Sequence, residues 1–233
     1  MLLTQSDKVH FKLGSLKLEP DYSGALYAPD HKTLIVADLH FEKASTLSDK
    51  TGAFFPPFDT QDTLLRLDDA IDRYRPDRVI FLGDTWHNEF GHSRMQDDDR
   101  QRMQSIITRS ELLFISGNHD EIAPVHGGPN MISEIELDGV ALRHEPHNDI
   151  DKFQICGHFH PVARLLQKGR MIRRRCFLVS ERQCVLPAMG ALSGGLNCLD
   201  PVYDRFVGST GRRAIVLGNH RLFQIGMKSL RLD

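Results

Sequence analysis

Three short apolar runs in the first half of the chain have the length and composition of buried β-strands. They are Thr33–Ala37, Arg78–Leu82 and Leu112–Ile115. Longer segments separate them, and in those segments apolar residues recur at helical spacing. Because strands that alternate with helices form parallel sheets with crossover connections, this half of the chain predicts an α/β architecture.

The segments between the first runs predict a loop and two helices. Residues 43–58 are expected to form a loop that faces the substrate, because the adjacent Pro56 and Pro57 rule out a helix and most connections are shorter. A first helix is capped by Asp59 or Thr60 and ends at Pro76, with one apolar face formed by Leu64, Leu67, Ile71 and Tyr74. A second helix is expected through Met95, Met103 and Ile106-Ile107, with Asp97-Asp98-Asp99 on its solvated face.

The second half of the chain changes to a pattern of short strands. Ile132–Leu137 and Val140–Arg143 flank Asp138-Gly139, which is a strong signal for a hairpin turn. Other short strands are expected near residues 9–28 and at Phe153–Cys156, Arg170–Arg175, Phe177–Val179, Cys184–Leu186, Ala214–Leu217 and Leu222–Ile225. No internal repeat or linker-like stretch interrupts the sequence, so a single domain over residues 1–233 is expected.

The composition of the chain limits the kinds of partner it can bind and the cellular compartment in which it is expected. With 29 basic and 31 acidic residues the formal net charge is −2, so an anionic partner must be attracted locally. No apolar run is long enough to cross a bilayer, and Met1 to Leu13 lacks the apolar core of a signal peptide. The 4 cysteines show no C-x-x-C spacing and are expected to be reduced. A cytoplasmic protein without a membrane partner is expected.

Polar residues with metal-binding side chains gather directly after the apolar runs. They are Asp38-Leu39-His40, Gly83-Asp84, Gly117-Asn118-His119-Asp120, His144 and Gly157-His158-Phe159-His160. In open α/β sheets the functional site lies outside the carboxyl ends of the strands, where all of these residues fall. Two histidines two apart in extended chain also point to the same side. One such cluster would fit an incidental surface turn, but the whole set predicts a single polynuclear metal site.

This order of motifs resembles that of the calcineurin-like metallophosphoesterases: D-x-H, G-D, G-N-H-D/E, H and G-H-x-H, matched here over residues 38–160. The resemblance implies a two-sheet mixed β-sandwich flanked by α-helices and two divalent metal ions. One ion would be held by Asp38, His40, Asp84 and His160, and the other by Asp84, Asn118, His144 and His158. Asp84 would bridge the two ions, and His119 would lie beside the ligands and face the substrate.

Further segments resemble the bacterial ligase-associated DNA damage response endonucleases, over most of the chain. They are Asp38–Lys43, Pro56–Thr60, Leu142–Pro146, Arg174–Phe177, Leu186–Ala188 and Gly194–Asn197. The family name reflects genomic association with DNA ligase and helicase partners. The resemblance therefore implies nucleic acid, or proteins of DNA repair, as partners beside the phosphate-ester substrate.

Charge balance within the expected site favours a phosphate substrate. Two dications about 3.5–4 Å apart repel each other by on the order of 15–20 kcal/mol at an effective dielectric constant near 20, so a shared carboxylate such as Asp84 is expected. Two carboxylates against two dications leave a positive surplus that suits a phosphate and a hydroxide.

Nitrogen and oxygen ligands without thiolate favour Mn, the preferred expectation, or Fe or Zn over Mg and Ca. The expected mechanism is in-line attack by a metal-bridging hydroxide, with His119 as proton donor to the leaving oxygen and Asp120 orienting it.

Several other residues admit two roles. Lys43, Arg143 and the run Arg173-Arg174-Arg175 are candidates for contacts with substrate phosphate, with solvated edge charges as the alternative. In a strand Arg173 and Arg175 share a face and Arg174 points the other way; Arg175 is retained as a substrate residue. His87 lies either behind the ligands or in a loop. Trp86 either lines the pocket or belongs to the core. The segment Gly194–Asn197 either approaches the site or forms a plain turn. No role is assigned to His10, His31, His92, His126, His147 and His220.

The expected activity is the hydrolysis of phosphodiesters, with DNA and cyclic nucleotides as candidate substrates. A phosphomonoesterase or a dinucleoside polyphosphate hydrolase would use the same ligands and is the alternative. A non-catalytic interaction scaffold is disfavoured because no expected ligand is missing. Nucleases that bind long duplexes usually carry a basic stripe, and only local arginines occur here. A small or single-stranded substrate, or a partner protein that supplies DNA affinity, fits this charge.

Overall fold

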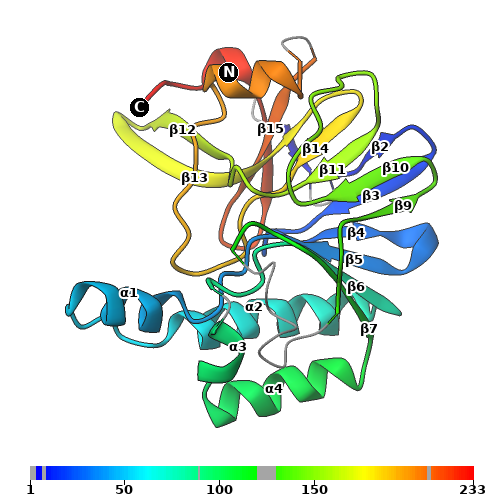
Figure 1. The fold of residues 1–233 in the computed structure, drawn as a ribbon. Coiled ribbons are helices and arrows are strands. Elements are labelled where there is room, and N and C mark those ends of the chain that lie inside the picture. Colours follow the sequence, from blue (N-terminus) through cyan, green and yellow to red (C-terminus); the bar gives the residue numbers. More distant parts are fainter. Residues whose placement is uncertain (1–3, 7–8, 89, 120–129, 209–210) are drawn as a thin grey trace.

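Two mixed β-sheets pack face to face in the computed structural model, which describes residues 4–6, 9–88, 90–119, 130–208 and 211–233 (Figure 1). Over these residues the first sheet has the order β2 (Phe11–Leu13), β3 (Leu16–Pro20), β4 (Leu26–Ala28), β5 (Thr33–Val36), β6 (Arg78–Leu82), β7 (Glu111–Ile115) and β8 (Met131–Ile132). The second has the order β1 (Thr4–Ser6), β16 (Leu222–Gly226), β15 (Arg213–Leu217), β13 (Arg170–Val179), β14 (Gln183–Val185), β11 (Gln154–Cys156), β10 (Val140–Arg143) and β9 (Glu134–Leu137). The predicted two-sheet architecture is confirmed.

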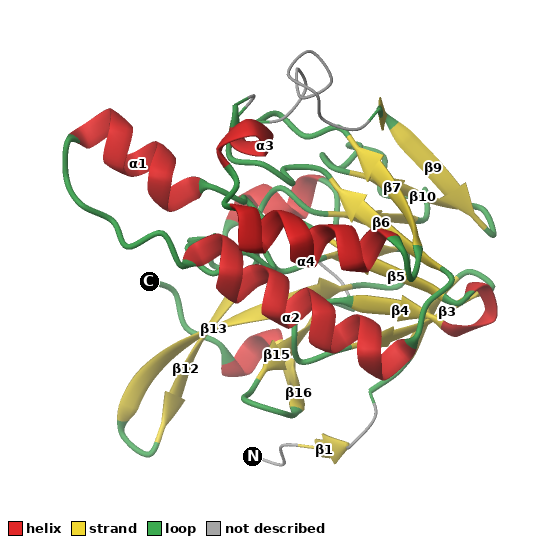
Figure 2. Cartoon of the chain, turned by 90° about the horizontal axis from the view of Figure 1, so that it is seen from below, coloured by secondary structure: helices red, strands yellow, loops and turns green. Residues whose placement is uncertain are grey.

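The α-helices lie on the side of the first sheet that faces away from the second sheet, and α1 extends beyond the edge of the sheet (Figures 1 and 2). They are α1 (Lys43–Thr51), α2 (Asp59–Tyr74), α3 (Gly91–Arg94) and α4 (Asp97–Ile107), and short 3-10 turns occur at η1 (Pro29–His31), η3 (Pro201–Arg205) and η4 (Met227–Ser229). None of the described helices is both long enough and apolar enough to cross a membrane.

Alternation along β5 explains how the first sheet is covered on both faces. Leu34 and Val36 pack with Leu64 and Leu67 of α2, while Ile35 packs into the core between the two sheets. Successive side chains of a strand point to opposite faces, so a continuous apolar run is what a doubly covered strand needs. The parallel pairing of β5, β6 and β7 confirms the prediction made from these runs.

The expected loop over residues 43–58 is wrong in its first half, which forms α1. A proline restricts only its own turn of helix, and Pro56 lies beyond Gly52, where the chain leaves α1 with a φ of 68°. Asp59 caps α1 instead of its own helix: one of its carboxylate oxygens accepts the backbone N–H groups of Lys43 and Ala44. The side-chain cap predicted for α2 is absent, and Phe58 stands at that position.

The expected second helix is divided into α3 and α4. The chain becomes extended at Met95 and Gln96, which buries the Met95 side chain and starts a new helix at Asp97. Acidic residues are favourable in a first helical turn. Asp97 and Asp98 are exposed as expected, but Asp99 is buried.

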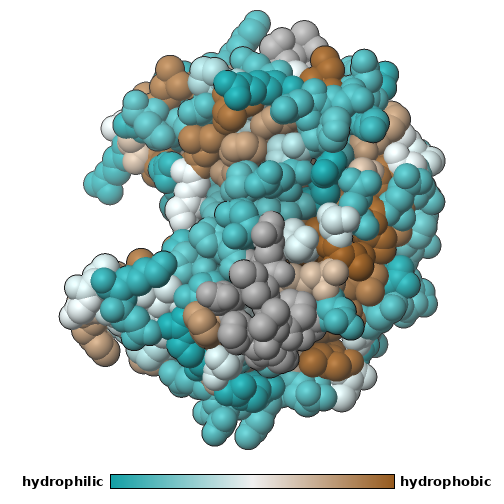
Figure 3. Space-filling model, in the orientation of Figure 1, coloured by the Kyte–Doolittle hydropathy of each residue, from teal (hydrophilic) through white to brown (hydrophobic). Residues whose placement is uncertain are grey.

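The strands expected at Arg170–Arg175 and Phe177–Val179 are one continuous strand, β13, because the buried Cys176 joins them. The second half of β13 lies within the sheet, and its first half pairs with β12 (Val162–Gln167) in a hairpin that leaves the sheet. The sequence analysis missed β12. This hairpin and α1 project on the same side of the molecule, and a hydrophilic hollow lies between them (Figures 1 and 3).

Candidate metal centre

The described residues of all the predicted motifs converge where the two sheets meet. Asp38 and His40 follow β5, Asp84 follows β6, and Asn118 follows β7 in the first sheet. His144 follows β10, and His158 and His160 follow β11 in the second sheet. The loops interlock through their main chains: the Asp38 N–H donates to Gly83 O at 3.2 Å, and the Asp38 carboxylate accepts the His158 N–H at 3.0 Å.

The first cluster of ligand atoms consists of Asp38, His40 and His160. His160 Nε2 lies 3.3 Å from His40 Nε2 and 3.2 Å from Asp38 Oδ1. Asp38 is fully buried and His40 is 4% exposed. One carboxylate oxygen and two imidazole nitrogens therefore face one point, as a transition-metal site requires.

The second cluster consists of Asn118, His144 and His158. Asn118 Oδ1 lies 3.0 Å from His144 Nε2 and 3.1 Å from His158 Nδ1. The two imidazole nitrogens are 3.2 Å apart. No ligand of this cluster carries a negative charge, and the His158 side chain is more open to solvent, at 29% exposed.

Asp84 lies between the two clusters. Its Oδ2 is 3.9 Å from His40 Nε2 and 3.5 Å from His144 Nε2. Its other oxygen is fixed by the backbone N–H of His119 at 3.0 Å. A single carboxylate oxygen thus faces both groups of ligand atoms.

The second cluster fits a bound cation. His144 Nδ1 lies 2.9 Å from the carbonyl oxygen of Leu82, which only accepts, so Nδ1 carries the proton and Nε2 presents a lone pair. That lone pair faces Asn118 Oδ1, another acceptor. Two acceptors at 3.0 Å repel each other unless a positive charge lies between them.

Ionisation of the buried ligands also fits divalent metals. Burial lowers the pKa of His40 and of His158, and the neighbouring histidines lower both further, so the neutral imidazoles that bind metals are favoured. Burial raises the pKa of Asp84, against the effect of His144. A carboxylate that is costly to ionise in its pocket gains most from a cation beside it.

Several ligands stand in the left-handed backbone region. The residues with φ between 45° and 68° include Asp38, His40, Asp84, His158 and His160. This conformation costs a residue with a Cβ atom about 1–2 kcal/mol, and such strain clusters at functional sites. At each of these positions the turn aims the side chain at the common centre.

Gly117 is required by the close approach of two loops. A Cβ atom at this position would lie 2.2 Å from Asp84 Oδ1 and 2.3 Å from the Asp84 backbone nitrogen. The glycine of the G-N-H motif therefore makes room for the central carboxylate. No side chain fits there without moving Asp84.

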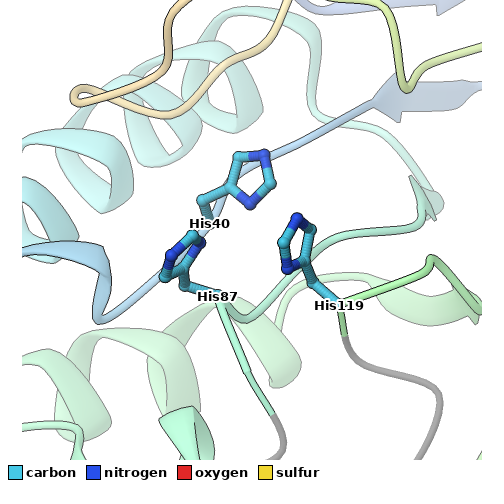
Figure 4. A group of neighbouring side chains, drawn as sticks. All are labelled: His40, His87 and His119. Carbon is cyan, nitrogen blue, oxygen red and sulfur yellow. The ribbon is translucent and has the colours of Figure 1, made fainter. Parts of the chain in front are cut away.

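His119 and His87 lie beside the first cluster, and their rings gather with that of His40 (Figure 4). The centroids of His40 and His119 are 5.4 Å apart, and His87 stacks on His119 at 5.1 Å. Burial lowers the pKa of His87 to about 4, and the charges of Lys43 and His119 add to this effect. The structure thus places His87 beside His40 and His119, and one ring nitrogen of each lies within 4.8 Å of the others. Asp120 and His126 lie outside the described residues.

The three cations predicted to contact substrate differ in their surroundings. Lys43 is half-buried at the start of α1, and its pKa is lowered by burial, with Asp59 and Asp84 opposing the shift. Arg143 pairs with Glu134 at 3.3 Å. Arg175 Nη1 donates to Ala188 O at 2.8 Å and to the two following carbonyl oxygens, in the turn that binds the Asp38 main chain. A substrate contact stays a prediction for all three.

Some residues at the site were missed by the sequence analysis or left undecided. Glu145 Oε1 lies 3.9 Å from His158 Nδ1, although the motif pattern assigns no role to this glutamate. The Gly194–Asn197 turn does approach the site: the Leu196 N–H donates to His160 O at 3.2 Å. Trp86 is buried in the core against Phe114, which was the more common of its two roles.

Comparison with known proteins identifies similar sequences and folds. A family model described as calcineurin-like phosphoesterase matches residues 31–170. The crystal structure of nuclease MPE from Pseudomonas putida is similar at 26% sequence identity and a TM-score of 0.72, covering 92% of this chain and 99% of that one.

More distant similarities are found to the phosphoesterase Yfce from Escherichia coli, with 12% identity and a TM-score of 0.42 over 83% of this chain and 97% of that one. Zinc-complexed Vps29 from Entamoeba histolytica has 14% identity and a TM-score of 0.35 over 82% of this chain and 96% of that one. A comparison with curated proteins found no match.

Proposed function

The chain belongs to the calcineurin-like phosphoesterase family and is a metal-dependent hydrolase of phosphoester bonds, and from this premise we propose that it is a dinuclear nuclease. The proposal includes manganese as the metal, a single domain over residues 1–233, a cytoplasmic location and a role in DNA repair. Asp38, His40 and His160 would hold one ion, Asn118, His144 and His158 the other, and Asp84 would serve both.

The position of Asp84 Oδ2 carries the dinuclear part of the proposal. It faces His40 on one side and His144 on the other, at 3.9 and 3.5 Å. A mononuclear site would leave one cluster of converging acceptors without a cation, and such a cluster is repulsive. The shared carboxylate also offsets the repulsion between two dications.

Two divalent ions would supply Lewis acidity toward phosphoryl oxygens and lower the pKa of water. The residues of the chain hold and orient the other groups. His119 Nε2 lies 4.0 Å from Asp84 Oδ2 at the edge of the first cluster, and its side chain is 42% exposed. It can therefore reach a substrate oxygen and donate a proton to the leaving group.

Two observations support a nucleic-acid diester as substrate. The similar structure from Pseudomonas putida is described as a nuclease. The hollow between α1 and the β12–β13 hairpin is open and hydrophilic, which suits an extended phosphodiester chain (Figure 3). Lys43, at the start of α1, and Arg175, on the hairpin, lie on the two elements that border it.

The test compares substrates and variants with added Mn²⁺. Purified protein should hydrolyse bis-p-nitrophenyl phosphate faster than p-nitrophenyl phosphate, and it should cleave a fluorescent DNA oligonucleotide. Asp84→Asn should abolish both activities and reduce the bound metal. Faster hydrolysis of the monoester would indicate a phosphomonoesterase and contradict the proposed diesterase. Cleavage of a dinucleoside polyphosphate but not of DNA would indicate a dinucleoside polyphosphate hydrolase and contradict the proposed nuclease. Full activity with one bound metal ion would contradict the dinuclear site.

A further inference from the structure

A second recess lies on the face of the β12–β13 hairpin that is turned away from the metal centre. Arg173 and Arg175 share one face of β13, where they donate to carbonyl oxygens of Gly195 and of Ala188–Gly190 beside the metal-binding loops. Ile172 and Arg174 alternate to the opposite face and line a groove of about 430 Å³. This volume falls within the range of ligand pockets, about 300–1,000 Å³.

The groove has an apolar lining that two hairpins build together. The hairpin β12–β13 contributes one wall and β15–β16 the other, with the apolar residues Leu165, Leu166, Ile172, Val216, Phe223 and Ile225. Of these residues Leu166 is 56% exposed, and Met171, beside the groove, is 43% exposed. Exposed apolar side chains around a recess mark a surface that binds other molecules.

The charged residues of the groove are all cations. Arg174, Lys228 and Arg231 line it, and no acidic residue does so among the described residues. The neighbouring Arg173 pairs with Asp233 on the other face, whereas these three form no ion pair with a described carboxylate. In a protein with a net charge of −2, this is a local positive field over an apolar surface.

We propose that the groove binds an acidic peptide segment of a partner protein, in which apolar side chains alternate with carboxylates. The apolar side chains would enter the recess between the hairpins, and the carboxylates would pair with Arg174, Lys228 and Arg231. Nucleic acid offers the negative charge but no aliphatic side chains for Leu165, Ile172 and Ile225. Because the groove and the metal centre lie on opposite faces of the hairpin, a bound peptide leaves the metal centre open.

Fluorescence polarisation with a labelled octapeptide that alternates aspartate with leucine or phenylalanine tests the proposal on the full chain. Wild-type protein should bind it saturably. The variant Arg174→Glu/Lys228→Glu should bind at least about tenfold more weakly, since like charges then face each other. Leu166→Ser, an exposed change that spares the core, should weaken binding without altering the melting temperature.

A matched control carries the same change in net charge elsewhere. Lys12 and Lys152 are exposed and do not line the groove, so Lys12→Glu/Lys152→Glu should bind the octapeptide like wild type. Every variant should hydrolyse bis-p-nitrophenyl phosphate at the wild-type rate, so peptide affinity is read independently of the proposed function. No saturable binding, equal loss in the control, or equal binding of a peptide with alanine at the apolar positions overturns the proposal. Displacement of the peptide by an oligonucleotide that binds more tightly to the same residues also overturns it.

Discussion

The two clusters of the candidate metal centre are similar in geometry but different in charge and exposure. The first contains the fully buried Asp38 carboxylate, and its His160 side chain is 16% exposed. The second has only an amide and two imidazoles, and its His158 side chain is 29% exposed. A buried negative ligand strengthens the binding of a cation, and exposure weakens it. We therefore expect the first cluster to bind its ion more tightly and the second to exchange its ion more readily.

Removal of the shared Asp84 carboxylate should abolish the difference in metal affinity between the two clusters. Asp84→Asn removes the negative charge that faces both clusters, so both ions should bind weakly and activity should fall by more than about a hundredfold. Metal content measured by elemental analysis after gel filtration, together with turnover of bis-p-nitrophenyl phosphate, provides the test. Retention of one tightly bound ion per chain would show that one cluster is sufficient alone.

A change beside the clusters should separate metal binding from turnover. His119→Ala removes a side chain that contacts substrate in the proposal but belongs to neither cluster. Turnover should fall by about 10²–10⁴-fold, the range for general acid catalysis, while both ions stay bound. Normal metal content with undiminished turnover would reject the role of His119.

Separate changes in each cluster should sharpen the comparison. Asp38→Asn removes the negative charge of the first cluster, and Asn118→Ala removes the neutral amide of the second. Mutation of a residue that only holds a metal ligand in place typically costs about 10–100-fold in metal affinity. Asp38 is a ligand itself in the proposal, so we expect Asp38→Asn to weaken binding at the tighter site by at least that factor. Asn118→Ala should leave the tighter site unchanged in a Mn²⁺ titration by calorimetry. The reverse pattern would mean that exposure, not charge, decides the order of loading.

The smallest expected effect is on the stability of the metal-free protein at low pH. The pKa values of His40 and His158 are lowered from 6.5 in the folded chain by burial. Below about pH 6.5 the unfolded chain therefore binds protons that the folded chain does not, so stability falls as the pH falls. Melting temperatures with EDTA should be lower at pH 5.5 than at pH 7.5. Because His40 is the more buried, His40→Asn should reduce this difference more than His158→Asn; equal effects would contradict the assigned difference in burial.

The parts of the fold predicted from sequence were those set by strong local patterns. The runs before Asp38, Asp84 and Asn118 consist almost entirely of apolar residues because both faces of their strands are covered. The helix α1 was missed because its stabilising cap comes from Asp59, beyond the prolines that suggested a loop. Such a contact depends on tertiary structure, and no local pattern records it.

The motif spacing predicted a set of residues that converge in the fold, but not the residues that surround them. Each of the predicted ligands takes part in a cluster, whereas the location of His87 beside His119 became clear only from the fold. The ion pair between Arg143 and Glu134 was not predicted either, because the two residues meet across the hairpin of β9 and β10. The sequence pattern indicates which chemistry a residue type allows. The packing determines which charged side chains are paired within the protein and which can contact a ligand.

The interlocked loops bring together candidate ligands that are synthesised at different times. His40 and His160 are separated by 120 positions, and ribosomes add about 5–20 residues per second. In the first cluster, His40 is therefore synthesised about 6–24 s before His160. A nascent chain that lacks His158 and His160 would have neither cluster complete. Selection of an ion by the complete first cluster would therefore wait until His160 has been synthesised.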